Sequence, residues 1–235
     1  MKLQSKAKIF LADERGCNET DWFRSYQTFN FGKYFNEHKH PFADLYVLND
    51  ETIAGGHSIT SQVEEDSYQL LLPVVGTVVC KINQGNETKV NTGQLKIFKL
   101  PKGAIVKLLN CYQSDLINFI QIRIRADLTE RNGVNQLFNF NLYENKNHLI
   151  SITGSITAAA KNPIVSIGKF DGRKEAVYKL KNEQNNLFVF VIEGVFEVQG
   201  RLLHSKDGLG LWNDSTDVEL EALSNDAIVL MMCLT

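Results

Sequence analysis

The sequence predicts an all-β protein built from two small barrels, and a pattern that occurs twice is the main reason. The first copy runs from Leu70 to Ile97 and the second from Phe188 to Trp212. In each copy an apolar strand reaches a glycine turn, a second strand follows, and a later glycine opens a third strand. Short strands separated by turns are typical of sandwiches and barrels, and an internal repeat indicates two such units.

Length and composition agree with two units and exclude some partners. The chain has 235 residues, of which 43% are hydrophobic, so both units can bury a core. The formal net charge is −2, and the basic residues are scattered along the sequence. We therefore expect neither a nucleic acid nor a membrane surface as partner.

The four cysteines are widely spaced, and none belongs to a C-x-x-C pair or a zinc-site pattern. Cys80 and Cys233 lie within apolar strand patterns and are expected to be buried thiols. The N-terminus lacks a long apolar segment, and no apolar run reaches membrane-spanning length. These features predict a cytoplasmic protein.

In the first half we expect a barrel over residues 1–125. Its strand signals are apolar runs that stop at Gly, Pro, Asn or Asp. Helix is expected to be scarce, with one short turn at 20–24. The predicted strand regions are Ala43–Leu48, Tyr68–Ile82 with a bend at Pro73 or Gly76, Gln94–Leu100 and Leu116–Ile124.

Residues 126–147 lose the alternation and become rich in asparagine, which is typical of a connector. The second barrel is expected over residues 148–235, where strand patterns resume. Its predicted strands are 148–152, 165–170, 176–180, 187–192, 195–198, 208–212, 218–222 and 227–233.

Motifs spread along the chain resemble the pirin family of bicupins. The resemblance implies two cupin barrels (double-stranded β-helix, jelly-roll) that face each other. The motifs are Ala12-Asp13-Glu14-Arg15-Gly16, Asp21-Trp22-Phe23, Thr28-Phe29-x-Phe31, Leu45-x-Val47-Leu48-Asn49-Asp50, Val191-x-x-Gly194-x-x-x-Val198-x-Gly200 and Asp207-Gly208-Leu209-x-Leu211-Trp212.

The resemblance also implies where a metal ion would bind. Family members hold iron or another divalent metal in the first barrel through H-x-H and H-x-E pairs. The glycine anchors place these pairs on Gln62-Val63-Glu64 and Val106-Lys107-Leu108. Val and Leu cannot ligate an ion, and two oxygen donors would hold a transition metal poorly. No cofactor is therefore expected, although the family binds one.

Alternating side-chain directions indicate what replaces the metal. We expect Gln62, Glu64, Val106 and Leu108 to point inward and line a pocket, and Lys107 to point outward. Tyr68 is a further candidate for this pocket. Glu64 is a candidate general base, or only the remaining polar partner of Gln62. A pocket of this kind suits a small apolar or aromatic ligand.

Three hypotheses for function follow. The first is a metal-free binding or regulatory protein. The second is an oxygenase similar to quercetin 2,3-dioxygenases, with a displaced metal held by His38, His40 or His57. Against the second, His38 and His40 lie in a polar stretch and His57 follows a turn. The third is a protein whose functional surface binds a protein partner.

Overall fold

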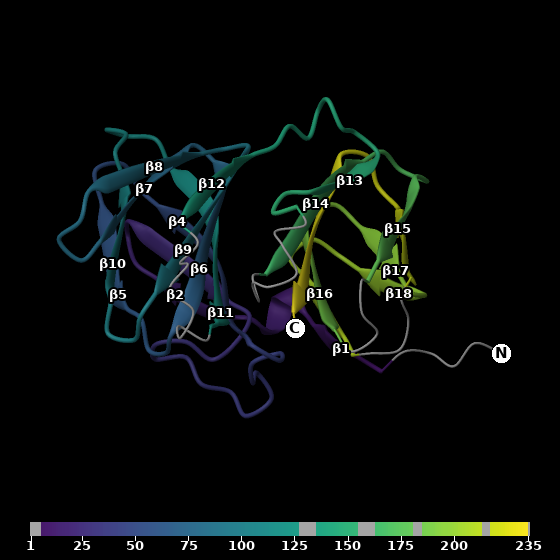
Figure 1. The fold of residues 1–235 in the computed structure, drawn as a ribbon, viewed down its shortest axis with the longest axis horizontal. Coiled ribbons are helices and arrows are strands. Elements are labelled where there is room, and N and C mark those ends of the chain that lie inside the picture. Colours follow the sequence, from purple (N-terminus) through teal and green to yellow (C-terminus); the bar gives the residue numbers. More distant parts are fainter. Residues whose placement is uncertain (1–5, 127–134, 155–162, 181–184, 213–216, 235) are drawn as a thin grey trace. The chain divides into compact units, whose positions relative to one another are not determined.

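A computed structural model describes residues 6–126, 135–154, 163–180, 185–212 and 217–234, which form two compact units (Figure 1). We call Arg15–Asn139 the N-terminal barrel. The C-terminal barrel comprises the described residues up to Glu14 together with those from Phe140 onward. Each unit is made of two antiparallel sheets, and the described residues contain one 3-10 turn, η1 (Ala12–Glu14), and no α-helix.

The N-terminal barrel pairs a seven-stranded sheet with a four-stranded sheet. In the larger sheet the strand order is β12-β9-β6-β11-β4-β3-β2, and in the smaller it is β5-β10-β7-β8. The strands of the larger sheet are β2 (Gly16–Glu19), β3 (Phe23–Gln27), β4 (Leu45–Ile53), β6 (Ser67–Val75), β9 (Gln94–Leu100), β11 (Ile117–Arg125) and β12 (Gln136–Asn139). Those of the smaller sheet are β5 (Ser58–Gln62), β7 (Thr77–Ile82), β8 (Glu87–Asn91) and β10 (Ile105–Asn110).

The C-terminal barrel repeats this plan with six and four strands. The orders are β1-β19-β16-β21-β14-β13 and β15-β20-β17-β18. The strands of the larger sheet are β1 (Ala7–Phe10), β13 (His148–Ser151), β14 (Ile164–Phe170), β16 (Asn186–Glu193), β19 (Gly208–Leu211) and β21 (Ala227–Leu234). Those of the smaller sheet are β15 (Glu175–Lys179), β17 (Phe196–Val198), β18 (Arg201–Leu203) and β20 (Asp217–Ala222).

The repeated pattern forms the same turn in both barrels, as the sequence predicts. Gly76 joins β6 to β7 with φ +77°, and Gly194 joins β16 to β17 with φ +82°. Residues with a Cβ rarely adopt this backbone conformation. A Cβ on Gly194 would also lie 2.5 Å from Ser224 Oγ and 2.6 Å from Ala227 Cβ. Both turns therefore require glycine.

The units do not divide where the sequence suggested. β1 lies in the range expected for the first barrel, but it pairs with β19 of the C-terminal barrel. The Ala12 amide also donates to Asp207 Oδ1 over 2.7 Å, which extends that attachment. Conversely, β12 lies in the expected connector and pairs with β9. A local residue pattern predicts a strand but not its distant pairing partner. The predicted boundaries of 1–125 and 126–147 are therefore wrong: β1 belongs to the C-terminal barrel and β12 to the N-terminal barrel.

The short helical turn expected at 20–24 is absent from the structure. Residues 20–22 instead bend into β3, where Thr20 Oγ1 accepts from the Phe23 amide over 3.1 Å. Part of the expected connector, 127–134, lies outside the described residues.

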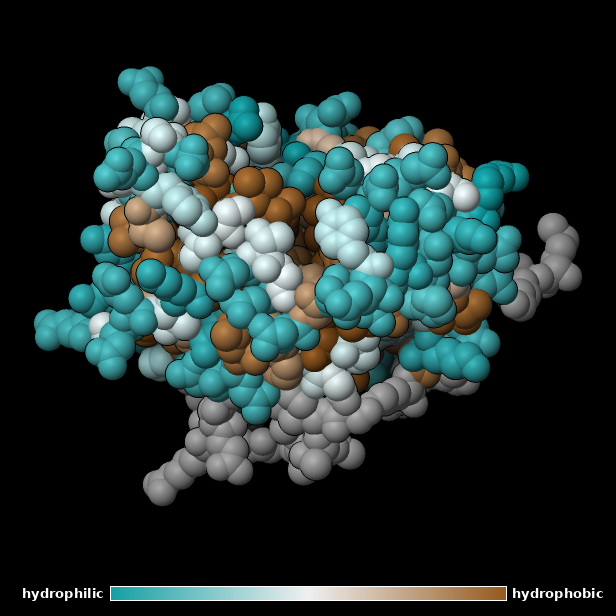
Figure 2. Space-filling model, turned by 90° about the horizontal axis from the view of Figure 1, so that it is seen from above, coloured by the Kyte–Doolittle hydropathy of each residue, from teal (hydrophilic) through white to brown (hydrophobic). Residues whose placement is uncertain are grey.

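Each barrel encloses its own core. The N-terminal core contains side chains from both sheets, such as Leu71 and Phe119 from the larger and Cys80 and Leu108 from the smaller. The C-terminal core includes Cys233, so both cysteines predicted to be buried are buried. The face shown in Figure 2 is mostly hydrophilic, with apolar residues in smaller groups. In the parts of the chain that the structure describes, no helix is long and apolar enough to cross a membrane.

Candidate binding site in the N-terminal barrel

The second pair of expected ligand positions lies on β10, inside the apolar core. Val106 and Leu108 are each 1% exposed, and Lys107 between them is exposed, as the strand alternation predicts. Leu108 lies opposite Cys80 on the neighbouring strand β7. These two side chains form part of the packed core.

The first pair does not point inward, which corrects the expectation for Gln62 and Glu64. Both residues are exposed, whereas Val63 between them is 1% exposed and belongs to the core. Gln62 pairs with the exposed Ile105 and donates through Nε2 to the Gly103 carbonyl over 3.3 Å. Its side chain therefore lies on the outer face of β5, and Glu64 lacks the buried setting that a desolvated base would need.

Tyr68 is buried, but it lies on the opposite face of its sheet from the barrel interior. On β6 the inward positions are Gln69 and Leu71, because Leu71 belongs to the core. Tyr68 pairs with Lys99, whose Nζ lies 5.9 Å from the centre of the tyrosine ring. It does not line the interior with Val106 and Leu108.

The three candidate histidines are all exposed. His38 lies 3.5 Å from the Glu37 carboxylate, and His57 stacks on Trp22 with ring centres 5.1 Å apart. Within the described residues, no group of three or more His, Cys, Asp or Glu side chains is placed to hold a metal ion.

The inner face of the large sheet carries a layer of polar side chains that the sequence motifs did not predict. Strand pairing places Gln27 opposite Asn49, and Asn49 opposite Gln121. In the next rows, Ser25 pairs with Glu51, and Arg123 pairs with Gln69. These side chains continue the inward face that Phe23, Ile53, Ile117 and Phe119 begin, so one end of the barrel interior is apolar and the other is polar.

Arg123, with 0% exposure, ties this polar layer to β5 on the other sheet. Its Nε donates to Gln69 Oε1 over 2.7 Å, and Gln121 Nε2 donates to the same oxygen over 3.2 Å. Its Nη2 donates to Ser61 Oγ over 2.7 Å, and Nη1 donates to the Gln62 carbonyl over 3.2 Å. Because β5 is an edge strand, these bonds help to hold that side of the barrel closed.

Glu51 is the buried acid of this layer, with 1% exposure. Ser25 Oγ and Asn49 Nδ2 donate to its Oε1 over 3.4 and 3.3 Å. Burial raises the pKa of Glu51 to about 7, although these hydrogen bonds and the charge of Arg123 favour the ionised form. A carboxyl group with such a pKa in a cavity is a candidate functional group.

Two neighbouring acceptors have no hydrogen-bond partner among the described residues. They are Gln27 Oε1 and Asn49 Oδ1, in side chains that are 4% and 0% exposed. A buried acceptor without a donor typically costs about 1–3 kcal/mol. Such atoms are uncommon, and two beside one buried carboxyl group indicate a site for an external donor.

A cavity of about 330 Å³ opens onto this layer. Its walls come from the region around β3, from β4 and β11, and from β5. The lining residues are Asn18, Trp22, Phe23, Ser25, Gln27, Phe31, Glu51, Ser58, Ile59, Thr60, Ser61 and Gln121. Gln62, Glu64, Tyr68, Val106 and Leu108 are not among them. One sequence signal for the cavity was available: on β11 the apolar alternation turns polar at Gln121 and Arg123.

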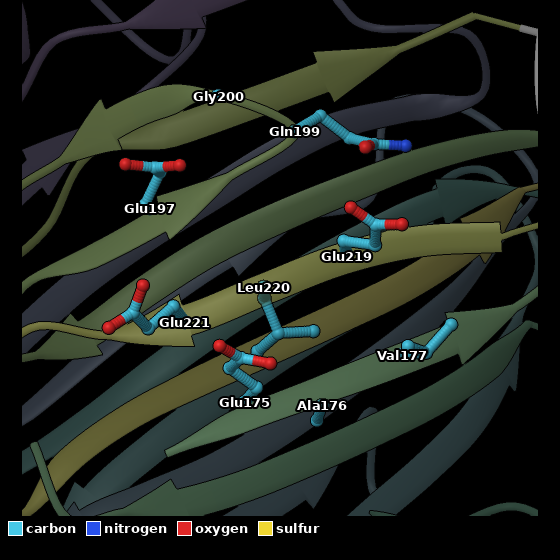
Figure 3. Close-up of a pocket in the computed structure, with 9 residues that line it drawn as sticks. All are labelled: Glu175, Ala176, Val177, Glu197, Gln199, Gly200, Glu219, Leu220 and Glu221. Atoms are coloured by element: carbon cyan, nitrogen blue, oxygen red, sulfur yellow. The ribbon is translucent and has the colours of Figure 1, made fainter. Parts of the chain in front are cut away.

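The C-terminal barrel has a larger groove, of about 630 Å³, on its smaller sheet (Figure 3). Glu175 pairs with Glu221, and Glu221 pairs with Glu197, so like charges lie on adjacent strands. Glu219 adds a fourth carboxylate, and only Leu220 of the lining is buried. This groove has neither the burial nor the unpartnered acceptors of the N-terminal cavity, which is the better candidate site despite its smaller volume.

Comparison with known proteins agrees with the motifs. Residues 142–233 match the family model described as the quercetinase C-terminal cupin domain. A quercetin 2,3-dioxygenase from Escherichia coli K12 is 23% identical over 224 residues, which cover 93% of this chain and 95% of that protein. The pirin-like protein YhaK from E. coli O157:H7 is 24% identical over 139 residues, covering 58% of this chain and 59% of that protein.

Solved structures show the same fold. The crystal structure of YhhW from E. coli superposes with a TM-score of 0.82 at 20% identity and covers 98% of both chains. A second structure of that protein, a bacterial pirin in complex with nickel(II), gives 0.81 at 20% identity and covers 97% of this chain and 99% of that one. With the repeated barrels and the motifs from Ala12 to Trp212, these matches support a pirin-like bicupin: the family model covers residues 142–233, and the solved structures show the same double-barrel fold.

Proposed function

We propose that this chain is a metal-free pirin-family protein that binds a small molecule in its N-terminal barrel, in a regulatory rather than an oxygenase role. The side chains at the four aligned ligand positions carry the proposal. Val106 and Leu108 offer no donor atoms and are packed in the core, while Gln62 and Glu64 are exposed. This set does not fit iron or nickel, which bind imidazole and carboxylate groups that converge on one point.

The cavity beside Glu51 supports the binding role. It combines buried polar groups with three aromatic side chains, and its volume of about 330 Å³ lies within the range of small-molecule sites. A cytoplasmic location and a protein partner remain predictions from the sequence.

Metal analysis tests the first half of the proposal. The chain would be produced in medium supplemented with iron, nickel and zinc, with E. coli YhhW purified in parallel as a control that is known with nickel(II). We expect far less than one metal ion per chain after dialysis. A stoichiometric metal that resists dialysis would overturn the proposal.

Oxygen consumption tests the alternative function suggested by the relative named quercetin 2,3-dioxygenase. We expect no uptake with quercetin, before or after addition of Fe(II) or Ni(II). Uptake that is lost in a His57→Ala or Glu64→Ala variant would show that a rearranged metal site exists.

A further inference from the structure

We propose that the N-terminal cavity selects a flat, uncharged aromatic molecule that carries two neighbouring N–H or O–H donors on one edge. This inference rests on the proposed binding function and adds the chemical class of the ligand. Glu51 and Gln27 accept hydrogen bonds from the donor edge, and the aromatic side chains of the cavity contact the ring.

At the polar end of the cavity, a buried acceptor has no donor among the described residues, whereas the Arg123 and Gln121 donors already have acceptors. Gln27 lines the cavity, is 4% exposed, and its Oε1 has no partner in the described parts of the chain. The guanidinium of Arg123 donates to Gln69, Ser61 and Gln62, and the Gln121 amide donates to Gln69. A ligand that supplies donors would complete the hydrogen bonding of this layer.

Electrostatics favours an uncharged ligand. The positive charge of Arg123 acts on Glu51 and favours its ionised form, against the larger effect of burial. A permanent cation in the cavity would therefore meet an existing positive charge. A permanent anion would meet the Glu51 carboxylate, with Asp50 adding to the negative charge around it. A neutral donor can instead form a charge-assisted hydrogen bond with Glu51 once this residue is ionised.

Shape favours a ring. Trp22, Phe23 and Phe31 line the cavity, and the rings of Trp22 and Phe23 lie 5.9 Å apart at 39°. The Trp22 ring also stacks against His57, with ring centres 5.1 Å apart. A volume of about 330 Å³ is at the lower end for small-molecule sites, which suits a molecule of one or two fused rings.

The test uses 2,3-diaminonaphthalene, a flat fluorescent compound that is neutral at pH 8 and carries two adjacent amino groups. Fluorescence titration at pH 8 should give saturable binding of one molecule per chain. Excess 2,3-dimethylnaphthalene, which has the same shape without donors, should displace the diamine at least tenfold more weakly than excess 1,2-diaminobenzene, which keeps the two adjacent amino groups. Equal competition by the two compounds would overturn the role of the donor edge.

Two variants connect binding to the named acceptors. Gln27→Leu and Glu51→Gln should each weaken binding about tenfold, the loss expected for one good hydrogen bond. The matched controls are Gln84→Leu and Glu197→Gln, which change exposed residues outside the cavity and should bind like the parent. Parent-like binding by both cavity variants would overturn the proposal.

Failure of this inference can be distinguished from failure of the proposed function. Native mass spectrometry of the purified chain would detect a different co-purified small molecule. If Trp22→Ala abolishes that association while the diamine does not bind, the ligand class is wrong and the binding function stands. Dialysis-resistant metal would instead overturn the proposed function, whatever the diamine does.

Discussion

The two barrels have cavities at corresponding places, and the side chains around these cavities differ in kind. The counterpart in the C-terminal barrel has a volume of about 260 Å³. It is lined by Leu149, Ser151, Ile164, Ser166, Val177, Tyr178, Lys179 and Cys233. The N-terminal cavity has Ser25, Gln27, Glu51 and Gln121 in its wall. One scaffold therefore surrounds a cavity whose wall contains a buried carboxyl group and amide side chains in one barrel, and a cavity whose wall contains neither in the other.

Strand pairing shows which residues of the two barrels occupy corresponding positions. Gln121 pairs with Leu71 and Asn49, while Met231 pairs with Val189 and Ser166. By the same registers, Arg123 corresponds to Cys233, Gln69 to Leu187 and Glu51 to Gly168. A cupin barrel evidently closes without the polar network, since the C-terminal barrel does so. The network is therefore a property of the N-terminal barrel rather than a requirement of the fold, which favours a binding role.

The largest expected effect comes from removing Arg123. Arg123→Leu should destabilise the protein by about 3–5 kcal/mol, because it removes the donor to Ser61 Oγ, the donor to the Gln62 carbonyl and one of the two donors to Gln69 Oε1 inside the barrel. The measurement is urea unfolding. Arg24→Leu is the matched control on the same barrel, since the Arg24 side chain is 46% exposed and should cost under about 1 kcal/mol.

A triple variant then tests the correspondence itself. Gln69→Leu, Gln121→Met and Arg123→Leu together make the layer resemble the C-terminal barrel. Replacing both partners of a buried hydrogen bond by apolar groups can be nearly neutral, and the triple variant does so for the bonds among Gln69, Gln121 and Arg123. It should therefore recover at least half of the stability lost in Arg123→Leu, although Ser61 and the Gln62 carbonyl remain without Arg123. A triple variant as unstable as the single one would contradict the correspondence.

The next effect concerns Glu51, which occupies the place of Gly168. Its pKa is raised from about 4.5 to about 7 in the folded state, so the folded chain binds a proton that the unfolded chain releases between these values. Stability is therefore highest below about pH 4.5 for this group, and it falls as the pH rises through 7. The shift corresponds to about 3 kcal/mol.

Urea unfolding of the parent and of Glu51→Gln between pH 4.5 and 8 measures this effect. The difference between the two proteins should change by about 3 kcal/mol across that range. Glu197→Gln, on the exposed groove of the C-terminal barrel, should follow the parent. Parallel curves for the parent and Glu51→Gln would mean that Glu51 does not titrate in this window.

The paired glycine turns offer a smaller effect. Gly76→Ala and Gly194→Ala should each cost about 1–3 kcal/mol, because alanine is strained at positive φ. The cost should be larger at Gly194, where the added Cβ meets Ser224 and Ala227. Gly200→Ala serves as control, because it has φ +69° but no atom within 4 Å of the new Cβ. The reverse order would mean that steric contact does not decide the cost.

The sequence predicted the fold better than the site. Glycine turns and apolar alternation are local signals, so β6, β7, β16 and β17 could be found from neighbouring residues. The partner of β1 could not, because its contacts lie about 200 residues away in β19. At the expected metal positions, motif spacing located β5 and β10 but not the outward orientation of Gln62. That orientation depends on pairing with Ile105 across the strands.

The smallest predicted effect concerns Gln27, whose replacement should not reduce the stability of the protein. Gln27→Leu should leave the stability unchanged or raise it by about 1 kcal/mol, because it replaces a buried acceptor that has no partner in the described structure by an apolar group. The corresponding residue of the C-terminal barrel, Ser151, is exposed, so solvent satisfies it there. Gln84→Leu, on an exposed turn, should change the stability by less than about 0.5 kcal/mol. If Gln27→Leu lowered the free energy of unfolding by more than about 1 kcal/mol, Gln27 would stabilise the empty barrel. If the variant kept its stability but bound the ligand more weakly, Gln27 would serve ligand binding rather than folding.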